Sequence, residues 1–234
     1  DRTLINCTVD HNSASQGGGI FLNSQAVARI YSSTLAHNSA ADSGGGIYSM
    51  GAVGIYSSTL EYNQSSGQAG GVHNDQGSSS YYPTLEMRDS TVRGNSAVLG
   101  GGAVIHNDQM SEISNSTFSG NTGGGLRNES QLYLHFVTIT DSLSVGTDVL
   151  GIGLENLGSL SFGNNLIAGN AGGDCVNTNQ IYENSYNLIQ DGSCDPHLSG
   201  DPLLDPLAEN GGPTLTHALQ PGSPAIDVGS ASCY

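Results

Sequence analysis

The chain of 234 residues contains no lysine and no tryptophan, and its only basic residues are five arginines. Because 21 residues are acidic, the formal charge is −16 and the isoelectric point is about 4.3. A nucleic-acid partner is excluded by charge repulsion, and the same sign excludes a polybasic membrane anchor. No apolar run approaches the ~20 residues that span a bilayer, so we expect no transmembrane segment.

Proline is scarce, with seven residues, whereas glycine is abundant, with 34. The glycines form clusters without a three-residue period, which excludes collagen. Charged residues make up only 11% of the chain. Apolar residues nevertheless recur regularly, which excludes a disordered chain. The chain is therefore expected to fold around a narrow core.

Two short patterns recur together along the chain at roughly 26-residue intervals. The first is a hexapeptide of the type Ser-Thr-x-x-x-Asn, and it occupies 7–12, 33–38, 58–63, 90–95, 116–121, 137–142 (weakly) and 165–170. The second is a glycine cluster followed by an apolar residue, at 17–20, 44–47, 70–72, 100–103, 123–126 and 151–154. Such repeats indicate a solenoid.

Within each repeat, apolar and polar residues alternate over short spans such as 26–31 and 132–137, which is typical of half-buried strands. No span has the spacing of a long amphipathic helix. We therefore predict an all-β chain, a right-handed parallel β-helix whose coils stack about 4.8 Å apart. Inward valine, isoleucine and leucine should form the core, with serine and threonine facing water.

The asparagines fall at two fixed positions of the repeat. Asparagine tolerates left-handed backbone geometry, and amides stacked in register can form hydrogen-bonded ladders. We predict one ladder of Asn12, Asn38, Asn63, Asn95, Asn121 and Asn170. We predict a second of Asn23, Asn74, Asn107, Asn128 and Asn156.

The glycine clusters and hexapeptides resemble the β-helix repeats of bacterial surface proteins, including polymorphic outer-membrane proteins. The last third resembles the choice-of-anchor Q domain more specifically, on the segments 164–170, 173–175, 186–189, 200–204, 207–219 and 222–227. The resemblance implies β-helix coils over 1–172 and a C-terminal region over 173–234 that continues or caps them. It also implies a secreted or cell-surface bacterial protein with no established general activity. Both ends look trimmed relative to that family.

Four cysteines in an apparently exported chain favour disulfides over a metal site, and no Cys-x-x-Cys or Cys-x-x-His spacing suggests zinc. Cys175 and Cys194 should pair around an irregular loop. Cys7 and Cys233 should lie roughly 40 Å apart, given some nine coils about 4.8 Å apart. Each would then bond a cysteine outside the chain, or Cys7 of one copy would bond Cys233 of the next, giving a head-to-tail filament.

An enzymatic alternative rests on a duplicated His-Asn-Asp-Gln segment. If His73 and Asp75 stack on His106 and Asp108, two imidazoles and two carboxylates converge, and they could perform acid–base chemistry as in a polysaccharide lyase or hydrolase. Repeat duplication, with the asparagines in the ladder and their neighbours solvated, is the favoured explanation of the segment. No cofactor is expected, although the acidic segment 191–205 offers a weak calcium site.

The favoured function is a non-catalytic extracellular module that is adhesive or builds filaments, with surface glycans or its own copies as partners. A carbohydrate-binding module without turnover is a further alternative, with stacking platforms at Tyr31, Tyr48, Tyr56, Tyr62, Tyr81 and Tyr82. Tyr81 and Tyr82 lie in a Gly-Ser-rich insertion that we expect to protrude and to contact a partner.

Overall fold

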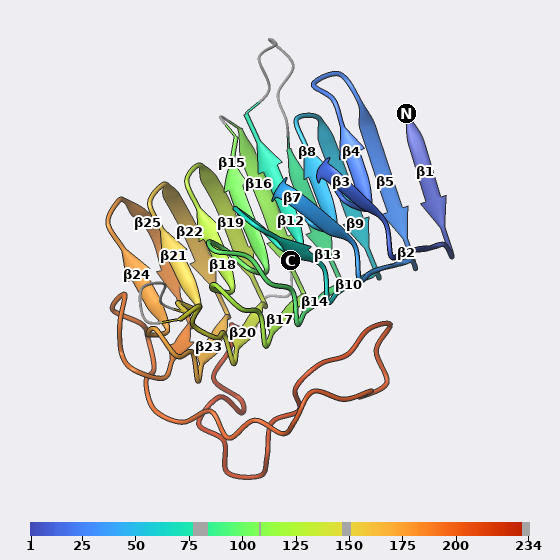
Figure 1. The fold of residues 1–234 in the computed structure, drawn as a ribbon. Helices are drawn as coiled ribbons and strands as arrows, with labels where there is room; N and C mark the ends of the chain where they lie inside the picture. The colour runs from blue at the N-terminus through green and yellow to red at the C-terminus, as the bar shows by residue number, and fades with distance from the viewer. Residues whose placement is uncertain (77–83, 108, 147–150, 231–234) are drawn as a thin grey trace.

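The computed structural model describes residues 1–76, 84–107, 109–146 and 151–230. These residues form 26 strands and no helix, and the long sheets are parallel, so the predicted parallel β-helix is confirmed (Figure 1). Within the described chain, no helix is long and apolar enough to cross a membrane.

The strands belong to four sheets, here named A to D. Sheet A contains β1 (Arg2–Ile5), β5 (Val27–Tyr31), β9 (Ala52–Tyr56), β13 (Leu85–Arg88), β16 (Met110–Ser114), β19 (Gln131–His135), β22 (Ser159–Gly163) and β25 (Ile181–Ser185). Sheet B contains β2 (Thr8–Asp10), β6 (Thr34–Ala36), β10 (Thr59–Glu61), β14 (Thr91–Arg93), β17 (Thr117–Ser119), β20 (Thr138–Thr140), β23 (Leu166–Ala168) and β26 (Leu188–Ile189). Sheet C contains β3 (Ser13–Gln16), β7 (Ser39–Ser43) and β11 (Gln64–Ser65). Sheet D contains β4 (Ile20–Leu22), β8 (Ile47–Ser49), β12 (Val72–Asp75), β15 (Ala103–His106), β18 (Leu126–Asn128), β21 (Leu154–Asn156) and β24 (Cys175–Asn177).

The core lies inside the coils and consists of apolar columns that follow the parallel register. One column runs through sheet A and comprises Ile30, Ile55, Met87, Ile113, Leu134 and Phe162. Another runs through sheet B and comprises Leu35, Leu60, Val92, Phe118, Ile139 and Ile167. All twelve side chains are fully buried. Because burying one such side chain contributes ~1.5–3 kcal/mol, the stacked columns supply the main stabilisation.

Each coil turns its corners with residues in left-handed backbone geometry. The corner between sheets A and B carries Asn6, Ser32, Ser57, Asp89, Asn115, Phe136, Asn164 and Tyr186, all with φ between 45° and 57°. The corner after sheet B carries His11, His37, Tyr62, Gly94, Gly120, Asp141 and Gly169. Equivalent corner residues lie above one another, so their side chains project from the same edge of the stack.

The first asparagine ladder is continuous over five residues. Nδ2 of each asparagine donates to Oδ1 of the next at 3.0 to 3.1 Å, and the ladder runs through Asn12, Asn38, Asn63, Asn95 and Asn121. Its sequence separations are 26, 25, 32 and 26 residues. Ser142 interrupts the ladder, because its hydroxyl has no partner among the described residues. Asn170 lies beyond the interruption and accepts the Ser142 N–H at 3.0 Å.

The second predicted ladder is only partly formed. Asn128 donates to Asn156 at 2.7 Å, Asn156 donates to Asn177 at 2.6 Å, and Asn107 donates to Asn74. Asn23 does not belong to it, which corrects the sequence prediction. The preceding residue, Leu22, occupies the register position of Ser49 and Asn74, so Asn23 lies one residue further along and is exposed.

The serines of the hexapeptides do not face water as predicted. Ser33, Ser58, Ser90 and Ser116 are almost fully buried. Each Oγ accepts a backbone N–H from the preceding coil at 3.0 to 3.2 Å, and Asn165 and Asn187 take over this role in the last coils. The serines therefore satisfy corner N–H groups that would otherwise be buried without a partner.

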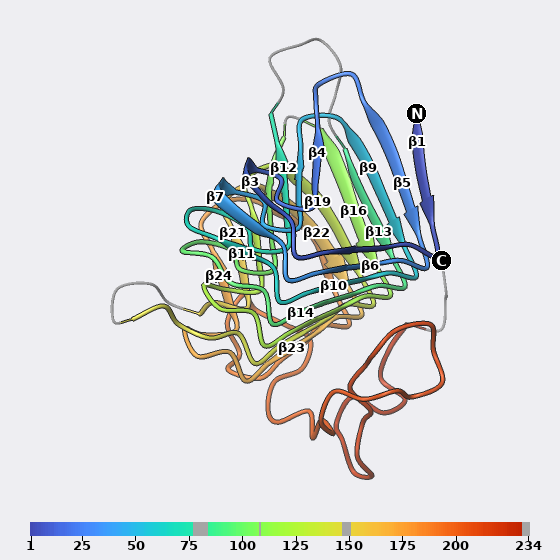
Figure 2. The same ribbon diagram turned by 45° about the vertical axis from the view of Figure 1, so that its right-hand side comes forward.

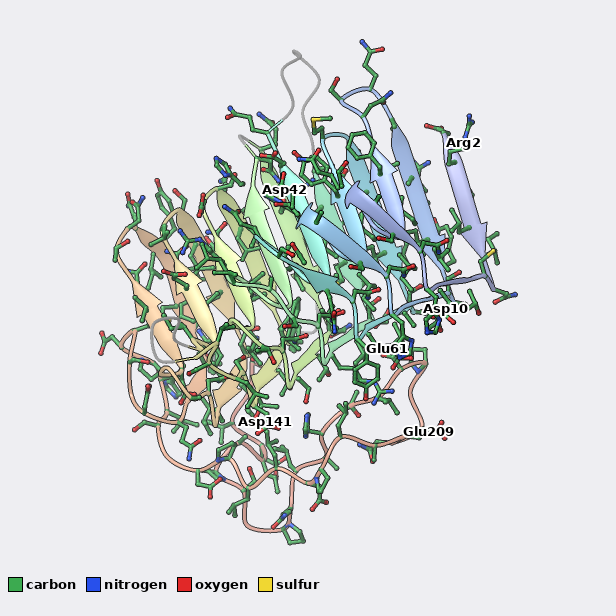
Figure 3. The ribbon with its side chains drawn as sticks, viewed as in Figure 1. Arg2, Asp10, Asp42, Glu61, Asp141 and Glu209 are labelled. Atoms are coloured by element: carbon green, nitrogen blue, oxygen red, sulfur yellow. A yellow bond between two sulfur atoms is a disulfide. The ribbon has the colours of Figure 1, made fainter. Side chains whose placement is uncertain are left out.

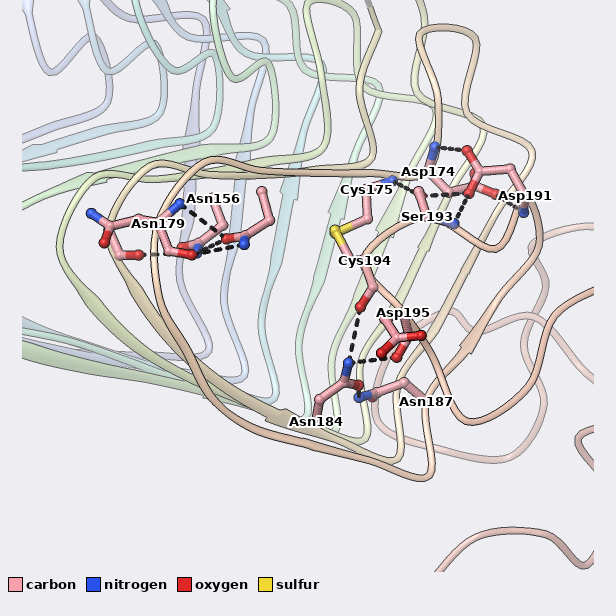
Figure 4. Close-up of a disulfide and its surroundings, with 12 residues drawn as sticks. Asn156, Asp174, Cys175, Asn179, Asn184, Asn187, Asp191, Ser193, Cys194 and Asp195 are labelled. Atoms are coloured by element: carbon pink, nitrogen blue, oxygen red, sulfur yellow. Dashed lines mark hydrogen bonds between the residues drawn. A yellow bond between two sulfur atoms is a disulfide. The ribbon is translucent and has the colours of Figure 1, made fainter.

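The coils continue past residue 172 and end at Ile189. Residues 190–230 contain no strand and lie outside sheet B (Figure 2). Thr91 donates to the carbonyl of Leu215 at 2.7 Å, and Ser119 bonds to Nε2 of His217 at 3.0 Å. The predicted disulfide between Cys175 and Cys194 is present and joins sheet D to the loop after β26 (Figure 4).

Candidate functional site

The outer face of sheet D brings together most of the residues of the duplicated segment. Strands alternate inward and outward side chains. The residue after the first position of each strand points outward, and this column comprises Phe21, Tyr48, His73, Val104, Arg127, Glu155 and Val176. Asp75, His106 and Glu129 lie beside it. We name Tyr48, His73, Asp75, His106, Arg127, Glu129 and Glu155 the outer cluster.

An aromatic column occupies the N-terminal half of this face. The rings of Phe21 and Tyr48 are stacked with centroids 5.6 Å apart, and Tyr48 meets His73 edge-on at 5.2 Å. Phe21 is 48% exposed, whereas Tyr48 and His73 are each 5% exposed. Phe21 therefore offers the only large open aromatic surface of the three.

Tyr48 is fixed by a hydrogen bond from its hydroxyl to Oδ2 of Asp75. Burial raises the pKa of Tyr48 above its ordinary value, and the bond to the Asp75 carboxylate raises it further. Oδ1 of the same carboxylate accepts the backbone N–H of Gln76 at 2.7 Å. Asp75 is thus held from two sides.

His73 is the unusual member of the outer cluster. Neither ring nitrogen has a hydrogen-bond partner among the described residues, although the side chain is buried. Burial lowers the pKa of His73, and the charge of Asp75 only partly opposes this effect. The ring is therefore neutral at pH 7, with one donor and one acceptor unused.

Charged pairs continue the face across the later coils. Arg127 donates to Glu129 at 2.5 Å and to Glu155 at 2.6 Å, and His106 Nδ1 lies 3.2 Å from Glu129. Burial alone would lower the pKa of Arg127, but the two carboxylates outweigh it and raise the pKa. These groups form a network fixed across three coils.

The predicted stacking of the two His-Asn-Asp-Gln segments is wrong in register. β12 and β15 pair Asp75 with His106 and His73 with Val104, so the two imidazoles do not lie opposite each other. Asp108, the fourth predicted residue, lies outside the described residues. Phe21, Arg127, Glu129 and Glu155 were missed by the sequence analysis. For Phe21, Arg127 and Glu155 a signal existed, because each follows a glycine cluster by two residues.

The structure describes four of the six predicted tyrosine platforms. Tyr31 and Tyr56 stack at 4.8 Å on sheet A, and the hydroxyl of Tyr56 donates to Glu86 at 2.7 Å. Burial and this bond raise the pKa of Tyr56 to about 12. Tyr48 is too buried to serve as the platform we predicted. Tyr81 and Tyr82 lie outside the described residues.

Three carboxylates of the acidic segment 191–205 accept hydrogen bonds within the protein. Asp191 accepts the N–H of Asp174 and the N–H of Ser193, both at 2.9 Å (Figure 4). Asp201 accepts the N–H of Leu203 at 2.8 Å, and Asp205 accepts Gln220 at 2.9 Å. These bonds close turns and anchor the C-terminal segment.

Of the two remaining cysteines, only Cys7 lies among the described residues. Cys7 is exposed and is not in a disulfide. Cys233 lies outside the described residues, so the link between them stays a prediction.

No family model, no curated protein and no solved structure matches this chain. The resemblance to the choice-of-anchor Q domain therefore stays a prediction.

Proposed function

We propose that the chain is a non-catalytic module of an extracellular surface that binds a neutral polysaccharide along the outer face of sheet D. The observation that carries the proposal is the outer cluster, with the open ring of Phe21 at one end and fixed charged groups along the rest. The disulfide supports an oxidising, extracellular location.

The arrangement suits a polymer of sugar rings. Aromatic faces stack on the C–H faces of pyranose rings, while carboxylates, guanidinium and imidazole groups bond to hydroxyls. Neighbouring strands of sheet D present such groups about 4.8 Å apart, a spacing comparable to the width of one pyranose ring. A polysaccharide that runs along the stack would therefore meet an aromatic ring on the first coils and charged groups on the later ones.

The charge of the protein favours a neutral polymer. The formal charge is −16, which repels anionic polysaccharides. The arginine of the outer cluster, Arg127, is already paired with Glu129 and Glu155, and Arg88 on sheet A is paired with Glu86 and Glu112.

Binding is favoured over cleavage because the carboxylates of the outer cluster already accept hydrogen bonds from protein donors. A glycoside hydrolase needs one carboxyl group to donate a proton and another to act as base or nucleophile. One observation favours cleavage as a second candidate function. Neither nitrogen of the neutral His73 imidazole has a hydrogen-bond partner in the described part of the chain, and the charge of Asp75 acts on the ring, as it would on a general base.

Binding is tested by affinity electrophoresis and calorimetry on a panel of neutral and acidic polysaccharides. The key variant is Phe21→Ser, and the matched control is Tyr182→Ser, which removes an aromatic ring that is 65% exposed on β25 of sheet A. We expect wild type and control to bind a neutral polymer and Phe21→Ser to lose binding about tenfold or more. Absence of binding to the whole panel, or equal binding by Phe21→Ser, would contradict the proposal.

Cleavage is tested on the same panel by measuring new reducing ends and unsaturated products. Turnover that disappears in Asp75→Asn and persists in Asp201→Asn would replace the binding function with the second candidate. Asp201 is a suitable control because its carboxylate closes a turn far along the chain.

A further inference from the structure

Two histidines and an aspartate converge at the corner that follows sheet B, on the first two coils. Asp10 ends β2, His11 follows it, and His37 follows β6. The N–H of His11 donates to the Ala36 carbonyl at 3.2 Å, and the N–H of His37 donates to the Glu61 carbonyl at 3.1 Å, so the corners stay in register. Figure 3 shows Asp10 on this edge of the stack, with Glu61 two coils further along.

The side chains project together because both histidines have left-handed backbone geometry, with φ of 55° and 51°. Their rings are stacked with centroids 4.9 Å apart and planes 11° from parallel. Asp10 Oδ1 lies 2.7 Å from Nδ1 of His11 and 3.3 Å from Nδ1 of His37. One carboxylate oxygen thus faces two Nδ1 atoms.

We propose that Asp10, His11 and His37 bind one divalent transition-metal ion of the zinc, nickel and copper class. One ligand atom from each residue lies within 4.8 Å of the other two. Two imidazole nitrogens and one carboxylate oxygen form a donor set that suits these ions. Each imidazole would carry its proton on the exposed Nε2 and bind the ion through Nδ1, while water completes the coordination.

The surroundings leave this position free for an ion. The side chains of His11, His37 and Asp10 are 73%, 48% and 40% exposed, so the rings can close on an ion without moving the backbone. Asp10 lies opposite Ala36, whose small side chain does not compete for space.

The site is limited to the first two coils by the residues of the third. Tyr62 takes the histidine position and stacks on His37 at 5.5 Å. Glu61, which follows Asp10 and Ala36 in register, pairs with Arg93, and Arg93 lies over the Tyr62 ring at 5.1 Å. Tyr62 therefore supports one side of His37, and the other side faces His11.

This inference does not depend on polysaccharide binding, because the site lies at a different edge of the molecule. The test uses the full chain without a histidine tag, titrated with Zn²⁺ and Ni²⁺ by calorimetry, and with Cu²⁺ followed by electron paramagnetic resonance. Asp10→Asn, His11→Asn and His37→Asn are the variants, since asparagine tolerates the left-handed geometry of the histidine positions. The control is His197→Asn, which removes an exposed histidine whose ring contacts Tyr186.

We expect one ion per chain, nitrogen hyperfine structure from two imidazoles in the copper spectrum, and no competition from Ca²⁺, which prefers oxygen ligands. Each of the three variants should bind about tenfold more weakly or worse, while the control binds like wild type. No binding by wild type, or binding that survives the three substitutions, overturns the proposal. Circular dichroism of each variant verifies the fold.

Discussion

Nδ2 and the backbone N–H of Asn63 both donate to Oδ1 of Asn95, at 3.0 and 2.9 Å. Asn95 is fully buried. Asn95→Ala should therefore leave the buried backbone N–H of Asn63 without a partner and leave Nδ2 only its bond to the Leu35 carbonyl. We expect the free energy of unfolding to fall by about 1–3 kcal/mol. Urea denaturation measures the loss. Asn12→Ala is the control, because Asn12 is exposed at the end of the ladder, and a loss as large as that of Asn95→Ala would contradict the argument.

Ser142 interrupts the same ladder, and Ser142→Asn should repair it. Asn121 and Ser142 each have a glycine beside them. A Cβ on Gly102 would lie 3.2 Å from Nδ2 of Asn121, and a Cβ on Gly125 would lie 3.0 Å from the Ser142 hydroxyl. Because Gly125 has no Cβ, an asparagine amide at position 142 should have the same space that the Asn121 amide has. The substitution should raise the free energy of unfolding by about 0.5–1.5 kcal/mol. Ser142→Ala deletes a hydroxyl that has no partner among the described residues, so it should be close to neutral. A destabilised Ser142→Asn protein would show that the cavity cannot hold the amide.

Gly102 should not tolerate a side chain. A Cβ there would lie 2.2 Å from the Gly125 carbonyl oxygen and 2.9 Å from the Phe118 ring, so the next coil must shift. We expect Gly102→Ala to lower stability by about 1–3 kcal/mol through overpacking. Gly212→Ala is the matched control, since its Cβ would find only the Thr214 oxygen at 3.8 Å. Thermal unfolding compares the two variants, and equal midpoints would refute the prediction.

The ionised carboxylate of Asp191 should stabilise the fold at neutral pH, and this contribution to the free energy of unfolding should disappear in acid. Burial would raise the pKa of Asp191, but hydrogen bonds from the Asp174 N–H and from Ser193 outweigh it, so the pKa lies below its ordinary value. A lowered native pKa stabilises the fold above the unfolded value of about 3.9, and this contribution disappears as pH falls through the native pKa. Asp191→Asn should thus be less stable than wild type at pH 7 and equal to it at the lowest pH. A difference that is constant from pH 7 to pH 2 would exclude this role.

The disulfide should stabilise the C-terminal coil. It closes a loop with a sequence separation of 19 residues, for which the chain-entropy estimate is about 3 kcal/mol. The double variant Cys175→Ala, Cys194→Ala should lose about that much in denaturant unfolding. Reducing agent should reproduce the loss in wild type and leave the double variant unchanged. A wild type that is insensitive to full reduction would contradict the prediction.

The fold was predictable because a glycine cluster and a hexapeptide recur in nearly every coil. The coils stack in register because their backbones approach closely at the glycines. The same signal sets the register at the outer cluster. Aligning Val72 with Ala103, as the glycines require, places Asp75 beside His106, whereas the duplicated letters suggested His73 beside His106. The glycines set the strand register, and the similar side chains do not, because a Cβ at a glycine position would clash with a backbone carbonyl of the next coil.

Two features could not be predicted from the sequence. The buried serines, of which Ser58 is one, read as ordinary surface residues, because only the three-dimensional path of the corner shows which N–H each hydroxyl meets. Asp10 and His37 also come together only because of the left-handed corner. Their spacing in the sequence matches no known metal-binding motif.

The asparagine ladder also gives the molecule an electrical polarity. The side-chain carbonyl oxygens of Asn38, Asn63 and Asn95 all point toward the preceding coil, so their dipoles add along the axis instead of cancelling. The positive end of this row faces the last coils. Beyond the interruption, the N–H and Nδ2 of Asn170 both donate to the carboxylate of Asp174. A negative charge thus sits where aligned dipoles favour it, as an acidic residue does at the start of an α-helix.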